Sequence, residues 1–238
     1  AMEPEVDSTI DFLNQMGAKI TGKGSTHLVI QGVDELFPVG MEMISDRIEA
    51  GTFMIAGAMS TEPLTVANCQ PHHLDTVIDK LRSAGCEIII TDNSVTVHPP
   101  KVIKPVNITT MPYPGFPTDL QAQFMVLMTL ADGVSVITET IFPDRFMHVS
   151  ELNRLQANIN LNLNIASVHG VRDWAVLRSW LPICVPAQLW CWQGSKRKAK
   201  PSSTVSTILT AAMTRSSRSS TPWAHILSET THNCRMEL

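Results

Sequence analysis

The chain has 238 residues, of which 44% are hydrophobic and 17% charged, a composition typical of a globular protein with a buried core. It contains no apolar run of the roughly 20 residues that a membrane-spanning helix needs, and residues 1–5 lack the basic and apolar regions of a signal peptide. The five cysteines form an odd, scattered set without a Cys-x-x-Cys pair, which argues against a structural zinc site and favours a reducing compartment. A cytoplasmic protein is therefore predicted.

The net charge of −4 is unevenly distributed along the chain. Residues 172–238 carry nine Lys or Arg and three Asp or Glu, a net charge of +6. Residues 1–171 carry nine basic and 19 acidic residues, a net charge of −10. All five tryptophans lie after residue 171, whereas 11 of the 12 glycines lie before residue 172. This break in composition indicates that the two segments differ in kind.

A helix followed by a short hairpin is repeated three times before residue 172, over residues 13–33, 81–97 and 152–171. Gly17 and Gly85 end the first two helices, where a left-handed C-terminal cap is expected. Gln156 takes this place in the third copy and should weaken that cap. Because strands and helices alternate, the pattern predicts an α/β or α+β fold built from repeated helix-and-sheet units.

Polar residues mark two helix starts between these copies. Asp46, with Glu49 three residues later, is expected to cap a helix whose residues 52–59 are apolar on nearly every side and therefore buried. Thr118 and Gln121 form a Thr-x-x-Gln capping-box pattern. This pattern would place the carboxylate of Asp119 in the first turn, beside unsatisfied N–H groups.

One further helix is indicated by apolar residues that share a single face. These residues are Leu74, Val77, Ile78 and Leu81. The adjacent pair His72–His73 has the wrong spacing for metal binding from a helix, because neighbouring side chains diverge and ligand pairs prefer a spacing of four residues. We therefore interpret the two histidines as surface residues.

Three strings in order and register resemble the UDP-N-acetylglucosamine 1-carboxyvinyltransferase family, whose members are UDP-N-acetylglucosamine enolpyruvyl transferases. They are Asp-Arg-Ile-Glu-Ala-Gly-Thr-Phe at residues 46–53, Phe-Pro-Thr-Asp-Leu-Gln-Ala-Gln at 116–123, and Ile-Thr-Glu-Thr-Ile-Phe with Arg-Phe-Met-His-Val at 137–149. Glu-Pro-Glu at residues 3–5 also matches that family. The resemblance extends to about residue 171. The shikimate-pathway enolpyruvyl transferases share the fold but not these strings.

The resemblance implies an inside-out α/β barrel, with helices inside each of two similar domains, of which this chain would hold an incomplete part. The family reaction moves the enolpyruvyl group of phosphoenolpyruvate onto the 3-hydroxyl of UDP-N-acetylglucosamine through a tetrahedral ketal and releases phosphate. It is the first committed step of peptidoglycan synthesis. The resemblance implies these two substrates as partners, no metal or other cofactor, and neither a nucleic acid nor a membrane.

The resemblance also assigns roles to single residues. Asp119 matches the carboxylate at the sugar 3-hydroxyl and is the candidate general base, because the reaction needs a proton acceptor within hydrogen-bond reach of that hydroxyl. Glu3 and Asp46 match further catalytic-site residues, Asp46 near the phosphoenolpyruvate end. Ile141, Phe142 and Arg145, with Asp119, match the substrate-binding set. None of the five cysteines matches the family's general-acid cysteine.

Three regions are predicted from this resemblance. Residues 1–44 would end the first domain, which carries the catalytic loop, and residues 45–171 would form part of the second domain. Residues 172–238 would be an out-of-frame, poorly ordered tail. A one-base shift of plausible codons for the family's Met-Ala-Thr-Asp-Leu-Arg-Ala-Ser gives Trp-Leu-Pro-Ile-Cys-Val-Pro-Ala, the sequence at residues 180–187. The same shift reproduces residues 204–214.

Two interpretations of function remain open. In the first, the chain is part of an enolpyruvyl transferase and has no turnover alone, because the general acid and much of the phosphate-binding set are absent. In the second, it is a non-catalytic nucleotide-sugar-binding or interaction module with a basic tail. Without their motifs, Asp119 would be a purely structural cap and Arg145 a surface ion-pair partner.

Overall fold

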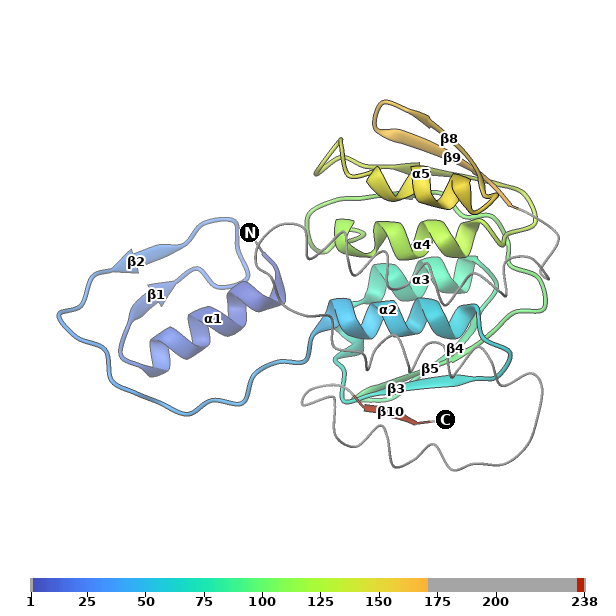
Figure 1. The fold of residues 1–238 in the computed structure, drawn as a ribbon. Coiled ribbons are helices and arrows are strands. Elements are labelled where there is room, and N and C mark those ends of the chain that lie inside the picture. The colour runs from blue at the N-terminus through green and yellow to red at the C-terminus, as the bar shows by residue number, and fades with distance from the viewer. Residues whose placement is uncertain (1, 171–234, 238) are drawn as a thin grey trace.

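The structure is a computed structural model that describes residues 2–170 and 235–237. Its first part is a helix followed by a two-stranded antiparallel hairpin, set apart from the remaining elements (Figure 1). These elements are α1 (Pro4–Gln15), β1 (Lys19–Thr21) and β2 (Val29–Gln31). Proline in the first turn suits α1, because the missing N–H would have no partner within the helix there.

The same helix-and-hairpin unit occurs twice more, which confirms the predicted repeat. The second copy is α3 (Asp75–Ser83), β4 (Glu87–Ile90) and β5 (Ser94–His98), and the third is α5 (Met147–Arg154), β8 (Asn158–Asn162) and β9 (Ile165–His169). In two copies, an asparagine side chain of the helix binds the backbone of the following strand. Asn14 exchanges two hydrogen bonds with the backbone of Ile20, and Asn153 does so with Ile159.

Left-handed residues end the three helices as the sequence indicates. Gly17 and Gly85 each have a φ of 103°, which confirms the predicted caps. Gln156 has a φ of 66° and adopts the left-handed conformation although it carries a side chain. The third turn thus keeps its shape at a residue type for which that conformation is less favourable.

Two four-stranded sheets form the larger part of the molecule. The added strands are β3 (Leu64–Ala67), β6 (Ile108–Thr109), β7 (Val134–Thr138) and β10 (Arg235–Glu237). One sheet has the order β10-β3-β5-β4, and the other has the order β6-β7-β9-β8. The edge strands of the two sheets differ in direction: β6 is parallel to its neighbour β7, whereas β10 is antiparallel to its neighbour β3. Apart from β10, the predicted tail lies outside the described residues.

A layer of helices lies between these two sheets (Figure 1). Besides α3 and α5 they are α2 (Arg47–Ala58) and α4 (Gln121–Met128), which are buried on most sides. Their side chains form one core with those of the strands, and Met54, Phe124 and Leu127 are fully buried in it. The predicted mixed helix-and-sheet fold with internal helices is confirmed. None of the helices in residues 2–170 is long and apolar enough to cross a membrane.

The start of α2 and the buried face of α3 agree with the sequence, whereas the start of α4 does not. Asp46 caps α2, because its Oδ1 accepts hydrogen bonds from the N–H groups of Ile48 and Glu49. The predicted apolar face of α3 is buried, at Leu74, Val77, Ile78 and Leu81.

The capping box predicted for Thr118 and Gln121 is wrong. A 3-10 turn, η2 (Thr118–Leu120), precedes α4, and no side-chain hydrogen bond caps either element. The hydroxyl of Thr118 instead donates to Glu139 Oε2 at 2.8 Å. The Thr118 hydroxyl, which the local pattern assigns to a helix cap, thus bonds instead to the buried carboxylate of Glu139, just after strand β7.

Candidate functional site

An ion pair between Asp119 and Arg145 lies at the start of α4. Arg145 Nη2 is 2.7 Å from Asp119 Oδ1, and about a third of each side chain is exposed. Arg145 Nη1 also donates to Thr118 Oγ1 at 3.3 Å. Asp119 lies in the turn η2 and Arg145 in the loop between β7 and α5, so the pair joins two segments that the resemblance had assigned to one site. An exposed carboxylate held by a guanidinium can receive a proton from, or bind, a polar ligand.

The same loop carries Ile141 and Phe142. The Phe142 ring is 55% exposed, and the Arg145 guanidinium lies 5.7 Å from its centroid. The backbone N–H groups of Ile141 and Phe142 donate to Glu139 Oε1 at 2.8 and 3.1 Å. The structure therefore brings Asp119, Ile141, Phe142 and Arg145 together.

Glu139 is fully buried at the base of this loop and is not among the site residues predicted from the sequence. A signal was present in the alternation of strand β7, because successive side chains of a strand point to opposite faces. Ser135 and Ile137 are buried in β7, and Glu139 continues their spacing by one more step. That alternation indicates a buried carboxylate in the middle of the third motif.

Asp46 lies at the same end of the helix layer as Asp119. The helices α2 and α4 lie side by side, and α2 also contacts the turn η2 that precedes α4, so both helices begin on the same side (Figure 1). Asp46 at the start of α2 and Asp119 just before α4 thus lie at corresponding ends. Within the described residues, no hydrogen bond or ion pair joins Asp46 to Asp119 or Arg145. Burial, and then the charge of Asp46, raise the pKa of Glu49.

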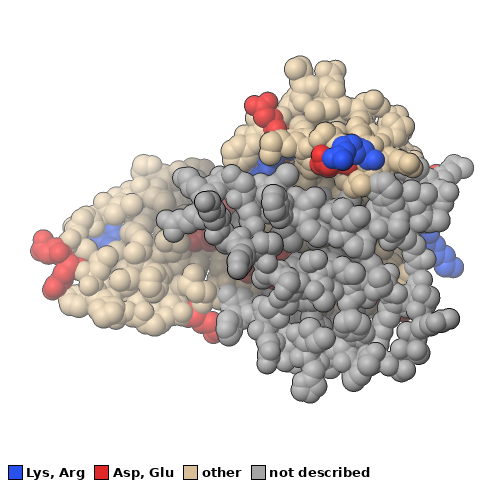
Figure 2. Space-filling model, in the orientation of Figure 1, with Lys and Arg blue, Asp and Glu red and all other residues tan. Residues whose placement is uncertain are grey.

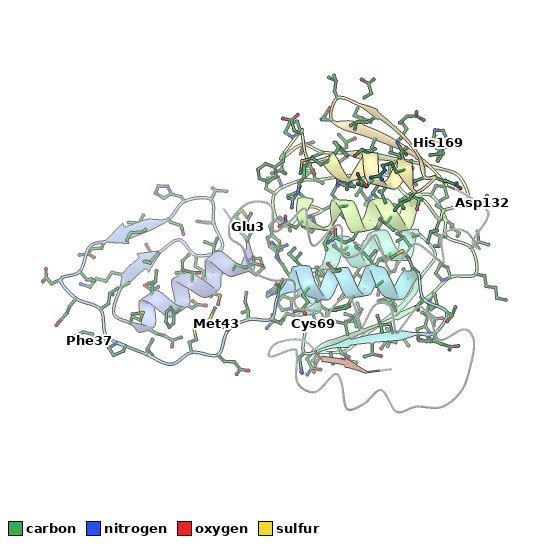
Figure 3. The ribbon with its side chains drawn as sticks, in the orientation of Figure 1. Glu3, Phe37, Met43, Cys69, Asp132 and His169 are labelled. Atoms are coloured by element: carbon green, nitrogen blue, oxygen red, sulfur yellow. The ribbon has the colours of Figure 1, made fainter. Side chains whose placement is uncertain are left out.

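Glu3 lies at the start of α1, near the junction between the first part of the chain and the helices that follow (Figure 3). Its Oε2 is buried and has no hydrogen-bond partner among the described residues. The structure does not join Glu3 to the Asp119–Arg145 pair within the described part of the chain.

A cleft of about 770 Å³ lies beside Glu3. It is lined from α1 by Pro4, Asp7, Ser8, Asp11, Asn14 and Gln15, and from elsewhere by Met2, Lys23, Met41, Glu42, Ile44, His72, His73 and Tyr113. Asp119, Ile141, Phe142 and Arg145 are absent from this lining. The cleft lies between the first part of the chain and the rest, and its lining contains none of the predicted site residues.

Arg47 joins the two sides of this junction. Its Nε is 2.8 Å from Glu5 Oε1 of α1, and its guanidinium lies 5.5 Å from the centroid of the Tyr113 ring. Only 11% of the Arg47 side chain is exposed. Arg47 is therefore a largely buried link between α1 and the start of α2, with an ion-pair partner 42 residues away in the sequence.

His72 and His73 form a short 3-10 turn, η1 (Pro71–His73), in which His72 is exposed and His73 half-buried. Within the described part of the chain, no three His, Cys, Asp or Glu residues come close enough together to hold a metal ion. Lys, Arg, Asp and Glu side chains are scattered over the described surface that Figure 2 shows, with no continuous patch of one sign in that view.

His148 in α5 carries a prediction about acid stability. Burial, and then the charge of Arg145, lower its pKa to about 4, whereas the unfolded value is near 6.5. The unfolded chain therefore binds more protons between these two values, and folding stability should fall as the pH is lowered through this window, by roughly 3 kcal/mol in total. We expect H148Q to flatten the loss of unfolding free energy between about pH 6.5 and 4, measured by urea denaturation at several pH values.

The exposed His27 supplies the matched control, because H27Q removes an imidazole that burial does not desolvate. Equal slopes in this pH window for H148Q and the unchanged chain would contradict the prediction. Only the slope matters here, since H148Q can also alter packing at every pH.

Comparisons with known proteins identify relatives of this chain. A protein named UDP-N-acetylglucosamine 1-carboxyvinyltransferase from Geotalea daltonii is 55% identical over 172 residues, which are 72% of this chain and 41% of that protein. A protein of the same name from Desulfosudis oleivorans is 52% identical over 170 residues, again 41% of its length. The chain thus spans about two fifths of the length of these relatives.

A solved structure, the enolpyruvyl transferase NikO from Streptomyces tendae, is similar with a TM-score of 0.63 and 29% identity, over 71% of this chain and 40% of that one. Residues 1–179 match the sequence model of the EPSP synthase (3-phosphoshikimate 1-carboxyvinyltransferase) family. The predicted resemblance to the enolpyruvyl transferases is confirmed, and the chain belongs to the EPSP synthase family.

Proposed function

We propose that this chain forms part of the active site of an enzyme that transfers enolpyruvyl from phosphoenolpyruvate to the 3-hydroxyl of UDP-N-acetylglucosamine. The observation that carries the proposal is the Asp119–Arg145 ion pair of 2.7 Å, partly exposed beside the Phe142 ring. The names of the relatives that are 52–55% identical support the choice of acceptor sugar. The substrates UDP-N-acetylglucosamine and phosphoenolpyruvate are thus the proposed partners, in the cytoplasm.

In this reaction, Asp119 receives the proton of the 3-hydroxyl while the hydroxyl oxygen forms a bond to C2 of phosphoenolpyruvate. A proton from a general acid reaches C3 and completes the tetrahedral ketal. Loss of phosphate from C2 and of a proton from C3 then restores the double bond and leaves the enolpyruvyl ether. The resemblance assigns the general acid to a cysteine that none of the cysteines here matches, so no residue of the 238 given is assigned that role.

Arg145 and the loop after β7 would bind the nucleotide sugar. The N–H groups of Ile141 and Phe142 already donate to Glu139, so these residues would contact the ligand through side chains or carbonyl oxygens. Arg145 uses Nη2 for Asp119 and Nη1 for Thr118, which fixes the guanidinium plane next to the carboxylate. Asp46 would lie toward the phosphoenolpyruvate end, and Glu3 would line the site.

The test is a chimaera in which residues 3–170 replace the aligned segment of the Geotalea daltonii relative. We expect the chimaera to release phosphate only when UDP-N-acetylglucosamine and phosphoenolpyruvate are both present. The unmodified relative, assayed in parallel, is the positive control. A parallel assay with shikimate 3-phosphate in place of the sugar tests whether the enzyme instead uses the acceptor that the family description names. A chimaera that is folded by circular dichroism but has no turnover would contradict the proposal.

The polypeptide of residues 1–238 alone is expected to have no turnover. It spans about two fifths of its relatives, and the proposed general acid has no match in it. Phosphate release by a purified, verified sample would contradict this expectation. Saturable UDP-N-acetylglucosamine binding, or salt-sensitive binding to another partner lost on deletion of residues 172–238, would instead favour the non-catalytic module.

The reading frame of residues 172–238 is open to a direct test. We expect resequencing of the coding DNA to show one inserted or deleted base near codons 165–175. Correcting it should restore an Asp-Leu-Arg segment at the position of residues 180–187. The predicted shift would be wrong if the DNA is as given and neither other frame produces the family pattern.

A further inference from the structure

Glu139 is an unusual residue for the place it occupies. It follows strand β7 directly and is fully buried, yet no Lys, Arg or His side chain in the described residues forms an ion pair with it. A buried carboxylate without a cation is costly unless hydrogen bonds compensate for the lost water. The stability of a charged Glu139 in this buried place therefore depends on the groups that surround it.

Four donors from three segments meet this carboxylate. Glu139 Oε1 accepts from Thr110 Oγ1 at 2.6 Å and from the N–H groups of Ile141 and Phe142, while Oε2 accepts from Thr118 Oγ1 at 2.8 Å. Burial by itself would raise the pKa of Glu139, but the combined hydrogen bonds outweigh it and lower the pKa below its usual value. The group is therefore a charged anchor at neutral pH.

The hydrogen bond to Thr118 leads to the candidate site. The Thr118 hydroxyl donates to Glu139 and accepts from Arg145 Nη1 at 3.3 Å, and Arg145 Nη2 holds Asp119. Because a hydroxyl has a single hydrogen, donating it to Glu139 turns the oxygen lone pairs toward Arg145. Glu139 thus fixes the direction of every hydrogen bond along this path to Asp119.

We propose that Glu139 is a positioning residue for the transfer reaction, which acts through two separate oxygens. Oε1 fixes the backbone of Ile141 and Phe142 and so shapes the nucleotide-sugar contact. Oε2 orients the Thr118 hydroxyl and, through it, the Arg145–Asp119 pair at which the sugar hydroxyl loses its proton. This inference rests on the proposed function.

The substitution E139Q separates the two oxygens. Three donors face the Oε1 position and one faces Oε2, so the amide oxygen must occupy the first place and the NH2 group the second. The bonds to Thr110, Ile141 and Phe142 then persist. The Thr118 hydroxyl, however, meets a donor in place of an acceptor, and its hydrogen has to turn away from position 139. In E139A both sets of bonds are lost.

A split between kcat and KM is therefore expected in the chimaera. E139Q should lower kcat at least about tenfold while the KM for UDP-N-acetylglucosamine changes less than about threefold. E139A should lower kcat and also raise this KM. E151Q is the matched control, because Glu151 is exposed on α5 and pairs only with Arg154 in the described structure. It should leave both constants unchanged.

A double-mutant cycle tests the path through Thr118. T118V removes the hydroxyl, so E139Q should lower kcat much less in the T118V background than alone. Additive effects, or an unchanged kcat in E139Q, would overturn the positioning role. A folded chimaera without turnover contradicts the proposed function instead, so the two failures are distinguishable.

Hydrogen exchange on the 238-residue chain tests the anchor without catalysis. The amides of Ile141 and Phe142 should exchange at least about tenfold faster in E139A than in the unchanged chain, while E151Q leaves them protected. Equal protection in E139A would overturn the role of Oε1, whatever the chimaera does.

Discussion

Replacing Asp119 by alanine should lower the kcat of the chimaera by about 10²- to 10⁴-fold, the range typical for loss of a general base. The carboxylate is the partner of Arg145 at 2.7 Å and, with 37% of its side chain exposed, it is open to a sugar hydroxyl. Without it, the hydroxyl proton has no fixed acceptor as the oxygen attacks phosphoenolpyruvate. D119N should show a similar loss, because the amide keeps the shape of the side chain but is a poor base. Phosphate release under saturating substrates measures the effect.

The matched control is D79N. Asp79 is an exposed carboxylate on α3 whose partner in the described structure is Arg82, 3.8 Å away, so this change removes the same charge from a residue outside the candidate site. We expect its kcat to equal that of the unchanged chimaera. If D119N keeps more than about a tenth of the parent kcat while it is folded, Asp119 is not the base, and a role in binding alone remains.

Local signals in the sequence predicted the ends of helices well. Gly17 and Gly85 are left-handed, and Asp46 caps α2, because each of these features depends only on residues a few positions apart. The amphipathic face of α3 was predicted for the same reason. The repeat of helix and hairpin followed from the recurrence of such local signals at a regular spacing.

Contacts between distant segments explain what the sequence could not predict. The Thr118 hydroxyl bonds Glu139, which is 21 residues away, and this bond replaces the local cap. Arg47 pairs with Glu5, 42 residues earlier, a contact that the residues around Arg47 in the sequence do not indicate. Strand alternation indicates that Glu139 is buried, but not which hydroxyls come to satisfy it, because those donors lie on other segments.

For the candidate site, too, the sequence predicts the local feature and not the contact between distant segments. Its residues could be chosen by resemblance, since Asp119, Ile141, Phe142 and Arg145 lie within matched strings. Their geometry could not, because the ion pair between Asp119 and Arg145 exists only when η2 and the loop after β7 meet. The anchor that brings these segments together, Glu139, lies between them and contacts both.

Replacing Phe124 by alanine should lower the free energy of unfolding by about 3–5 kcal/mol, the usual cost of emptying a large aromatic site in a core. Phe124 lies in α4, has no exposed surface and packs edge-on against Phe116, with ring centroids 5.3 Å apart. Because α4 lies between the two sheets and is buried on most sides, its neighbours have little freedom to collapse into the space. Urea denaturation followed by circular dichroism measures the loss, and a melting temperature lower by roughly 10 °C should accompany it.

F37A provides the control for this change. Phe37 is 58% exposed and lies in the segment between β2 and α2, so the same atoms are removed without leaving an internal cavity (Figure 3). Its urea midpoint should move only slightly, with an unchanged denaturant slope. Equal losses for F37A and F124A would mean that α4 is not packed between the two sheets in solution. In that case the turn that carries Asp119, which leads directly into α4, would have no rigid support, and the arrangement of Asp119 and Arg145 would fail with it.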